Sequence, residues 1–241
     1  MLTVDLSVEA IQYAINNKIN FIVSQYGLNY SPVKKYPTIL VKKLILLSKF
    51  PISVFVLGSP FFVTENGVCD VIASKLFLNI LDVLQTTNKV GKKIVIGRVC
   101  SPHEYPNQKK SFQLNHLLER SINNLETSII TYLGDLKQKI EKVAIVGIER
   151  VTDNTLINLK KSNIDCVISM GMLGHYESIL ANDLKLSVIS LSFYDCVKKA
   201  LEKMLNSLSL EFPNEEFVLF DSKNSYNIMG FYEKNALKIT L

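Results

Sequence analysis

The chain has 241 residues, of which 48% are hydrophobic and 20% charged, and its formal net charge is +5 at pH 7. Such a chain can bury a proper core as one large domain or two packed halves, which excludes a disordered, purely polar protein. No apolar run reaches the roughly 18 residues that a spanning helix needs, and no basic leading segment indicates a signal peptide. We therefore expect no membrane association.

The four cysteines lie far apart in the sequence, without the close spacing of a zinc site or a redox pair. Cys166 stands inside an apolar segment, where a reduced thiol that fills the core is expected. A reducing cytoplasm is the predicted location.

Helices and strands alternate through the first half of the chain. Ser7 caps a predicted helix whose apolar residues Val8, Ile11, Ala14 and Ile15 follow helical spacing. An apolar strand is predicted at 19–24. The further elements expected before residue 100 are a Pro-bounded loop at 31–37, a helix at 38–49, a strand at 52–57, a helix at 68–84, a basic turn at 89–93 and a strand at 94–99.

The second half repeats this alternation after a polar segment at 100–113, which carries two prolines and is the best linker candidate. We expect a long helix at 114–139. The elements predicted after it are strand 142–147, helix 153–162, strand 164–169, helix 175–183, strand 186–190, helix 193–206 and closing strands near 215–221 and 228–239. The fold class is therefore α/β, with helix-covered sheets in two similar halves. The expected division is an N-terminal half at 1–100, a linker and long helix at 101–140, and a C-terminal half at 141–241.

Two of the predicted strands end in a similar way. The strand at 19–24 runs into Gln25 and Tyr26, and the strand at 164–169 runs into Met170 and Gly171. In open α/β sheets the site lies just beyond the carboxyl ends of the strands. The side chains at these ends are chemically quiet, so the sequence gives no active site by itself.

The three histidines are His103, His116 and His175. His116 and Glu119 share one helix face, a spacing that suits a metal but is more typical of a solvated helix surface. His175 opens a helix, where it can bind an anion, act as an acid or base, or simply cap the turn. Neither a nucleophile elbow nor a phosphate-binding glycine motif is present in the sequence.

Two segments are rich in lysine, at 31–50 and 89–110, and the first contains no acidic residue. Lysines in loops suit contacts with phosphates, which give salt-dependent affinity without sequence preference. An ordinary solubilising surface is the alternative. The candidate nucleic-acid contacts are Lys34, Lys35, Lys42, Lys43, Lys89, Lys92, Lys93, Arg98, Lys109 and Lys110.

The order of several segments resembles the Nif-three-like family, also described as type 2 GTP cyclohydrolase I. The resemblance is carried by VDLSVEAIQYAINNKINFIVSQYGL at 4–28, SVFVLGSPFFVTENGVCDVIASKL at 53–76, IGRV at 96–99, KVAIVG at 142–147, NIDCVISMGMLGHYESIL at 163–180 and LSVISLSFYDCVKKALEKM at 186–204. It implies two related α/β halves facing each other across a dinuclear metal site, often assembled into a ring-shaped oligomer. A homo-oligomer is therefore among the expected partners.

This sequence departs from the family at nearly every metal ligand. The family's paired histidines fall on Gln25 and Tyr26, and its next histidine and aspartate fall on Gly58 and Phe62. Its last histidine and glutamate fall on Phe193 and Val197, whereas His175 does match a family histidine. Divalent metals need carboxylate or imidazole ligands, so we expect no bound metal, no cofactor and no catalysis. The degenerate metal-site positions are Gln25, Tyr26, Gly58, Phe62, Phe193 and Val197.

The leading hypothesis is a non-catalytic Nif-three-like protein that acts as a binding factor on a ribonucleoprotein. The ribosome is the expected partner because it is the most abundant polyanion in the cytoplasm, and such a factor could occupy and idle the particle. Two alternatives stay open. One is a metal-dependent hydrolase or nucleotide-processing enzyme with relocated ligands, and the other is a purely structural homo-oligomer.

Overall fold

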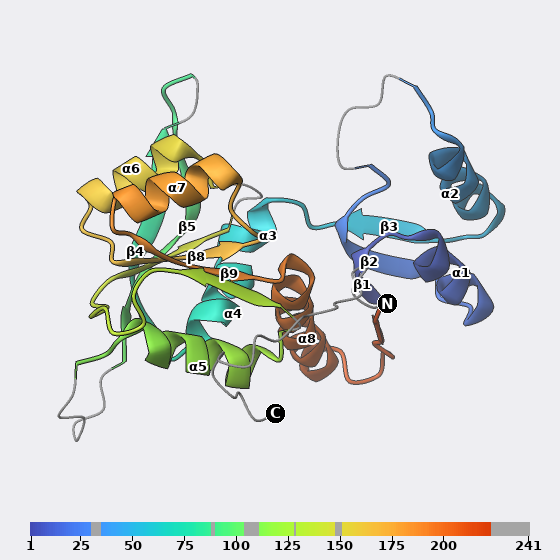
Figure 1. Cartoon of the computed structure of the whole chain (residues 1–241). Coiled ribbons are helices and arrows are strands. Elements are labelled where there is room, and N and C mark those ends of the chain that lie inside the picture. The colour runs from blue at the N-terminus through green and yellow to red at the C-terminus, as the bar shows by residue number, and fades with distance from the viewer. Residues whose placement is uncertain (30–34, 88–89, 104–110, 128, 148–150, 223–241) are drawn as a thin grey trace, which may run out of the picture.

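The computed structural model describes residues 1–29, 35–87, 90–103, 111–127, 129–147 and 151–222. The chain forms two β-sheets, one of four strands and one of six, which lie side by side with helix α8 (Phe193–Glu211) between them (Figure 1). In the described part of the chain, no helix is both long and apolar enough to cross a membrane.

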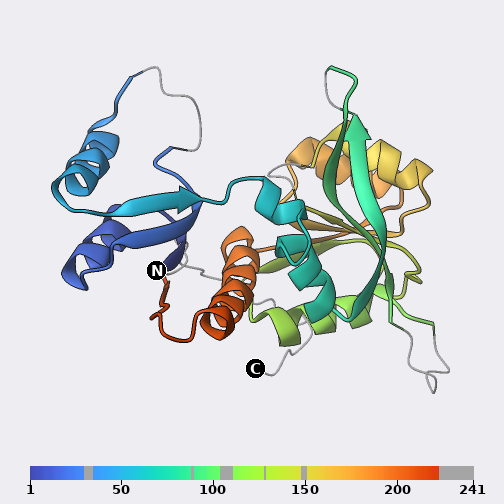
Figure 2. The same cartoon turned by 180° about the vertical axis from the view of Figure 1, so that it is seen from behind.

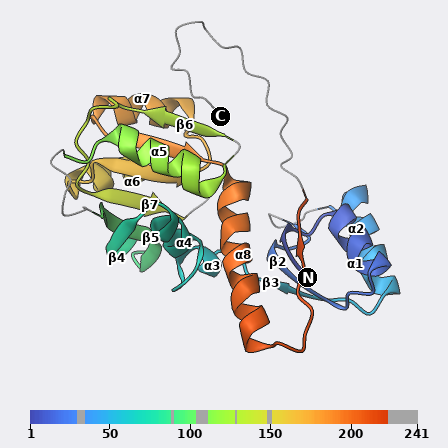
Figure 3. The same ribbon diagram turned by 90° about the horizontal axis from the view of Figure 1, so that it is seen from below.

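The four-stranded sheet is parallel, with the strand order β10-β1-β2-β3. Helices α1 (Val8–Asn16) and α2 (Thr38–Lys49) lie on one side of this sheet and α8 on the other (Figure 3). The Ser7 hydroxyl accepts a hydrogen bond from the Ala10 N–H at 3.0 Å, which confirms the predicted cap of α1. The strands are β1 (Leu2–Asp5), β2 (Phe21–Tyr26), β3 (Ser53–Val56) and β10 (Leu219–Phe220).

The six-stranded sheet is mixed, with the order β4-β5-β7-β8-β9-β6. Strands β7, β8 and β9 are parallel, and β4, β5 and β6 extend the sheet by antiparallel pairing. Helices α6 and α7 cover one face, and α4, α5 and α8 cover the other (Figure 1). The bounds are α3 (Pro60–Val63), α4 (Val68–Lys75), β4 (Leu78–Thr87), β5 (Lys93–Pro102), α5 (Leu114–Leu125), β6 (Ile130–Leu133), β7 (Val143–Val146), α6 (Asp153–Lys161), β8 (Cys166–Met170), α7 (His175–Asp183) and β9 (Ser187–Leu191).

Two helices end earlier than predicted, and a strand follows where the second part of each helix was expected. The helix expected at 68–84 ends at Lys75, and Phe77 has a left-handed φ of 52°, which turns the chain into strand β4. The helix expected at 114–139 ends at Leu125, where Glu126 has a left-handed φ of 50°, and strand β6 follows. Short apolar runs fit both helix and strand, and only their pairing with distant strands decides between the two.

The sheets divide the chain at a different place from the predicted halves. Strands β4 and β5 lie largely before residue 100 but pair with each other and with β7, so the boundary at 100 falls inside β5. The predicted linker at 100–113 likewise begins inside β5. The fold class is confirmed, since the chain is an α/β protein with two sheets covered by helices. The strand predicted at 228–239 lies outside the described residues.

A buried ion pair joins the six-stranded sheet to helices α3 and α4. The Arg98 Nε on β5 lies 2.7 Å from the Asp70 Oδ1 on α4, and the two side chains are 8% and 16% exposed. The same guanidinium donates to the Val63 carbonyl at 2.8 Å and to the Thr64 carbonyl at 3.3 Å. It thereby satisfies carbonyl groups at the end of α3 that have no partner within the helix.

Breaking this pair should destabilise the protein strongly. Asp70→Asn leaves the Arg98 charge buried without its carboxylate, so we expect the free energy of unfolding to fall by about 3 kcal/mol in urea titrations. Lys139→Gln is the control, because it breaks the ion pair of Lys139 and Glu141, in which both side chains are more than half exposed. Equal losses for the two variants would contradict a structural role for the Arg98 pair.

Candidate functional site

Three aromatic side chains meet where the resemblance placed the metal site. Tyr26 at the end of β2 and Phe193 at the start of α8 have ring centroids 5.6 Å apart with an interplanar angle of 28°. Phe193 and Phe62 on α3 also have centroids 5.6 Å apart, at 44°. Stacked and tilted aromatic pairs at these separations stabilise their contact beyond simple burial. Tyr26, Phe62 and Phe193 are named the aromatic cluster below.

Gln25 and Gly58 connect two neighbouring strand ends beside the aromatic cluster. The Gln25 side chain is fully buried, and its Nε2 donates to the Gly58 carbonyl at 2.8 Å. The Gly58 N–H donates to the Gln25 carbonyl at 3.1 Å. Gly58 has a φ of +66°, a conformation that glycine adopts without strain. These two residues act here as a structural link between β2 and β3.

The space behind the aromatic cluster is closely packed. Val197, one turn into α8, is fully buried, and Phe62 is only 4% exposed. A Cβ atom on Gly147, directly after β7, would lie 3.0 Å from the Cβ of Phe62 and 2.6 Å from the Sγ of Cys69. A larger residue at position 147 would therefore force the neighbouring core to shift. The ends of β2 and β7 and the start of α8 enclose side chains rather than a polar cleft.

The residues at this site do not fit the dinuclear metal that the resemblance implies. Among the six predicted positions, one carries an amide, one a phenol and three an apolar side chain, and the sixth is a glycine. Divalent metal ions need imidazole, carboxylate or thiolate ligands instead. Burial raises the pKa of the adjacent Cys69 thiol to about 12, so that thiol is neutral near pH 7. Within the described ranges, no three His, Cys, Asp or Glu side chains group closely enough to hold a metal.

The histidines occupy structural or exposed positions. The His116 Nδ1 accepts a hydrogen bond from the Gln113 N–H at 3.1 Å, which forms part of the N-terminal cap of α5. His175 is the exposed first residue of α7, and its carbonyl accepts a hydrogen bond from the Ser178 hydroxyl at 2.7 Å. The pairing of His116 with Glu119 as metal ligands has no support in this geometry.

The predicted nucleic-acid contacts that the structure describes lie on two parts of the molecule. Lys35 and Lys42 are exposed near α2, and Lys92 and Lys93 are exposed where the β4–β5 hairpin turns back. Figures 1 and 2 show α2 beside the smaller sheet and this hairpin turn on the larger sheet, so these lysines belong to two different parts of the molecule. Lys34, Lys89, Lys109 and Lys110 lie outside the described residues.

Two of the predicted contacts are less accessible than the others. Arg98 is 6% exposed and paired with Asp70, so the structure removes it from the set of surface contacts. Lys43 is half-buried, and desolvation lowers its pKa, an effect that the Asp5 carboxylate partly offsets. The sequence could not distinguish these two cations from exposed ones, because burial depends on how α2 and β5 pack.

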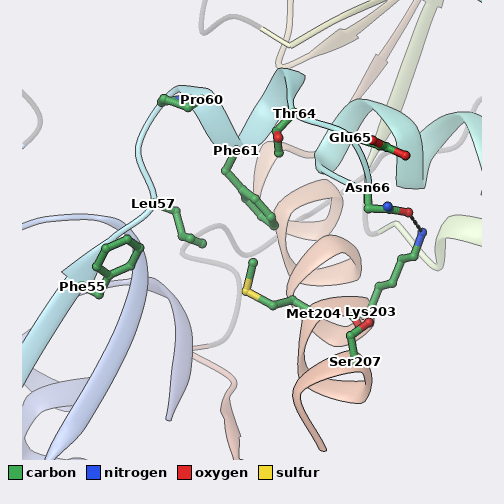
Figure 4. Close-up of a pocket in the computed structure, with 10 residues that line it drawn as sticks. All are labelled: Phe55, Leu57, Pro60, Phe61, Thr64, Glu65, Asn66, Lys203, Met204 and Ser207. Carbon is green, nitrogen blue, oxygen red and sulfur yellow. Dashed lines mark hydrogen bonds between the residues drawn. The ribbon is translucent and has the colours of Figure 1, made fainter. Parts of the chain in front are cut away.

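A cavity of about 580 Å³ is lined mainly by residues of β3, α3 and α8 and was not predicted from the sequence. It opens between β3, α3 and α8, with Leu57, Phe61 and Met204 pointing into it (Figure 4). The Lys203 Nζ at its rim donates to the Asn66 Oδ1 at 2.9 Å. None of the six predicted metal-site positions lines this cavity. Elements distant in the sequence form it, so no local motif could have indicated it.

The fold and the site together define a two-sheet α/β protein whose inter-sheet site is filled by aromatic packing. The model of the Duf34/NIF3 (NGG1p interacting factor 3) family matches residues 1–225. The chain therefore belongs to the DUF34/NIF3 family, as the resemblance predicted.

Solved structures share this fold at low sequence identity. Reduced HcgD from Methanocaldococcus jannaschii is 21% identical, with a TM-score of 0.68 over 87% of this chain and 77% of that one. The Staphylococcus aureus hypothetical protein SA1388 is 15% identical, with a TM-score of 0.72 over 95% and 86%. TTHA1606 from Thermus thermophilus is 18% identical, with a TM-score of 0.67 over 93% and 84%. These likenesses show the fold alone, and no curated protein sequence matches the chain.

The aromatic cluster should contribute measurably to stability. Phe62→Ala removes a buried ring that contacts Phe193, and we expect the free energy of unfolding to fall by about 3 kcal/mol. Phe55→Ala is the matched control, because Phe55 is 56% exposed and should give a clearly smaller loss. Denaturant unfolding of both variants measures the difference. A Phe62→Ala protein as stable as the control would show that the site is loosely packed.

Proposed function

We propose that this protein is a non-catalytic member of the DUF34/NIF3 family that acts as a binding factor. The aromatic cluster carries the proposal, because Tyr26, Phe62 and Phe193 pack against one another where a catalytic member would need ligands. A site filled in this way stabilises the fold and provides no group to polarise a substrate or activate water. Selection for binding would keep the core and the surface without the metal chemistry.

Metal analysis tests the loss of catalysis. We expect the purified protein to contain well below one equivalent of zinc, iron or manganese per chain by inductively coupled plasma mass spectrometry. Dialysis against each metal should leave the unfolding midpoint unchanged, because a bound metal would stabilise the folded state by mass action. A stoichiometric metal that raises this midpoint would instead support the enzyme with relocated ligands.

The partner in this proposal is a ribonucleoprotein, with the ribosome in the cytoplasm as the first candidate. The chain carries 27 lysine and arginine residues against 22 acidic ones, and Lys92 and Lys93 are exposed at the hairpin turn. Exposed lysines on a turn that extends from the sheet can reach phosphates without a complementary surface. A factor held there would keep the particle idle by occupying it.

Cosedimentation with ribosomes across a salt series tests this partner. We expect binding at low salt that weakens steadily as salt rises, because bound phosphates release counterions. Lys92→Glu combined with Lys93→Glu, or Lys34→Glu combined with Lys35→Glu, should weaken binding and make the salt dependence shallower. Lys137→Glu combined with Lys161→Glu makes the same charge change at two other exposed lysines and is the control. Binding that ignores salt, or no binding at low salt, would contradict the proposal.

A further inference from the structure

Helix α2 exposes more apolar surface than a helix at the edge of a soluble protein needs. Seven of its twelve residues are apolar, and only Leu40 among them is buried. Ile45 is 47% exposed, and Val41 and Leu44 are each 39% exposed. A helix that is apolar on most sides is normally covered by other elements. In Figure 3, α2 lies at the outer side of the small sheet, next to α1.

The exposed apolar residues form a stripe with a basic border. Val41, Leu44 and Ile45 are spaced by three and four residues, so they lie on one side of the helix. Lys42 and Lys49, both exposed, are seven residues apart and follow the next row of the same helix. Such a stripe flanked by like charges is the pattern of a helix that packs against another amphipathic helix.

Positive charge predominates around α2, and the acidic group that acts on it is the Asp5 carboxylate, which faces Lys43. Residues 10–64 contain six lysines and no aspartate or glutamate. The stripe therefore lies in a positive environment that the same part of the chain does not neutralise. A partner that covers it gains affinity if its own apolar residues are flanked by carboxylates.

We propose that α2 docks an amphipathic helix of a partner protein that carries apolar residues bordered by Asp and Glu. The apolar residues of that helix would cover Val41, Leu44 and Ile45, and its carboxylates would face Lys42 and Lys49. With twelve residues, α2 is about 18 Å long. The partner helix can therefore contact it over a length of about three helical turns. This site is separate from the hairpin lysines and does not depend on the proposed ribonucleoprotein.

Other occupants fit the stripe less well. Two copies of α2 facing each other would bring Lys42 and Lys49 of both copies together, which is unfavourable. The segment 223–241 of this chain carries three lysines and one glutamate, so it does not supply the missing negative charge. RNA phosphates would pair with the lysines but would leave the apolar stripe in contact with water.

The test measures binding of a fluorescent helical peptide of about 14 residues, with leucines at helical spacing and glutamates on both borders, to the full-length protein. A scrambled peptide of the same composition is the control ligand. We expect the designed peptide to bind at least about tenfold more tightly than the scrambled one by fluorescence anisotropy. Val41→Gln combined with Ile45→Gln, and Lys42→Gln combined with Lys49→Gln, should each weaken binding by about tenfold or more.

Two control variants separate this site from other surfaces. Ile179→Gln on α7 alters an isoleucine that is 46% exposed, close to the 47% of Ile45, and should leave peptide binding unchanged. Lys92→Gln combined with Lys93→Gln should also leave it unchanged. Circular dichroism of each variant checks that the fold is intact, which is expected because the altered side chains are exposed.

Several results would overturn the proposal. The first is equal binding of the designed and scrambled peptides, and the second is peptide binding that the α2 variants do not affect. A third is binding of poly(U) RNA, or of vesicles with about 30% phosphatidylserine, that competes with the peptide and is lost in both α2 variants. The fourth is self-association at micromolar concentration that the α2 variants abolish, which would assign the stripe to a second copy.

Discussion

The two sheets depend on one helix for their common core. Helix α8 places Val197, Ala200 and Leu201 in a buried cluster that also contains Leu2 and Val4 of the small sheet. The same cluster includes residues of α4, β7 and β8 from the larger sheet. Without α8, the exposed face of the small sheet would have only weak contact with the rest of the molecule. The position of every residue between the sheets therefore depends on how α8 is held.

Polar contacts fix both the start and the body of α8. The Ser192 hydroxyl accepts from the Asp195 N–H at 3.3 Å, and the Asp195 Oδ2 accepts from the Thr127 hydroxyl at 3.1 Å. The Lys199 Nζ lies 2.8 Å from the Glu126 carboxylate, beyond the end of α5. These contacts place Phe193, the first residue of α8, against Tyr26 and Phe62. The aromatic cluster thus follows from the same helix that joins the sheets, and the site between them is part of the core.

Much of the fold could be predicted because its strands and helices carry strong local patterns. The residue type of Ser7 predicts the cap of α1. The spacing of apolar residues predicts the helix at 38–49 and the strands that correspond to β2, β7, β8 and β9. Strand β4 was missed because its apolar residues also fit a helical spacing, and only pairing with β5 determines its conformation. The proximity of Tyr26, Phe62 and Phe193 was inferred from the resemblance to a family. It could not be derived from the sequence itself, because 36 residues separate the first two and 131 separate the last two. The burial of Arg98 had no signal in the sequence, since its partner Asp70 lies on a separate element.

The two proposed contact surfaces, the α2 stripe and the hairpin lysines, lie on different parts of the molecule, which affects how binding at one can influence binding at the other. The α2 stripe lies on the part of the molecule that contains the small sheet, whereas Lys92 and Lys93 lie on the hairpin of the larger sheet (Figure 1). Changes at sites this far apart, with no shared partner, usually have additive effects on free energy. A protein that binds through both surfaces at once would gain from a rigid spacing between them, because the second contact then forms at a high effective concentration. The packed rings of the aromatic cluster favour this rigidity, since close-packed side chains resist relative movement of the elements they join. The aromatic cluster joins β2, α3 and α8, so the packing that fills the space between the sheets also holds in place the elements that carry the exposed surfaces.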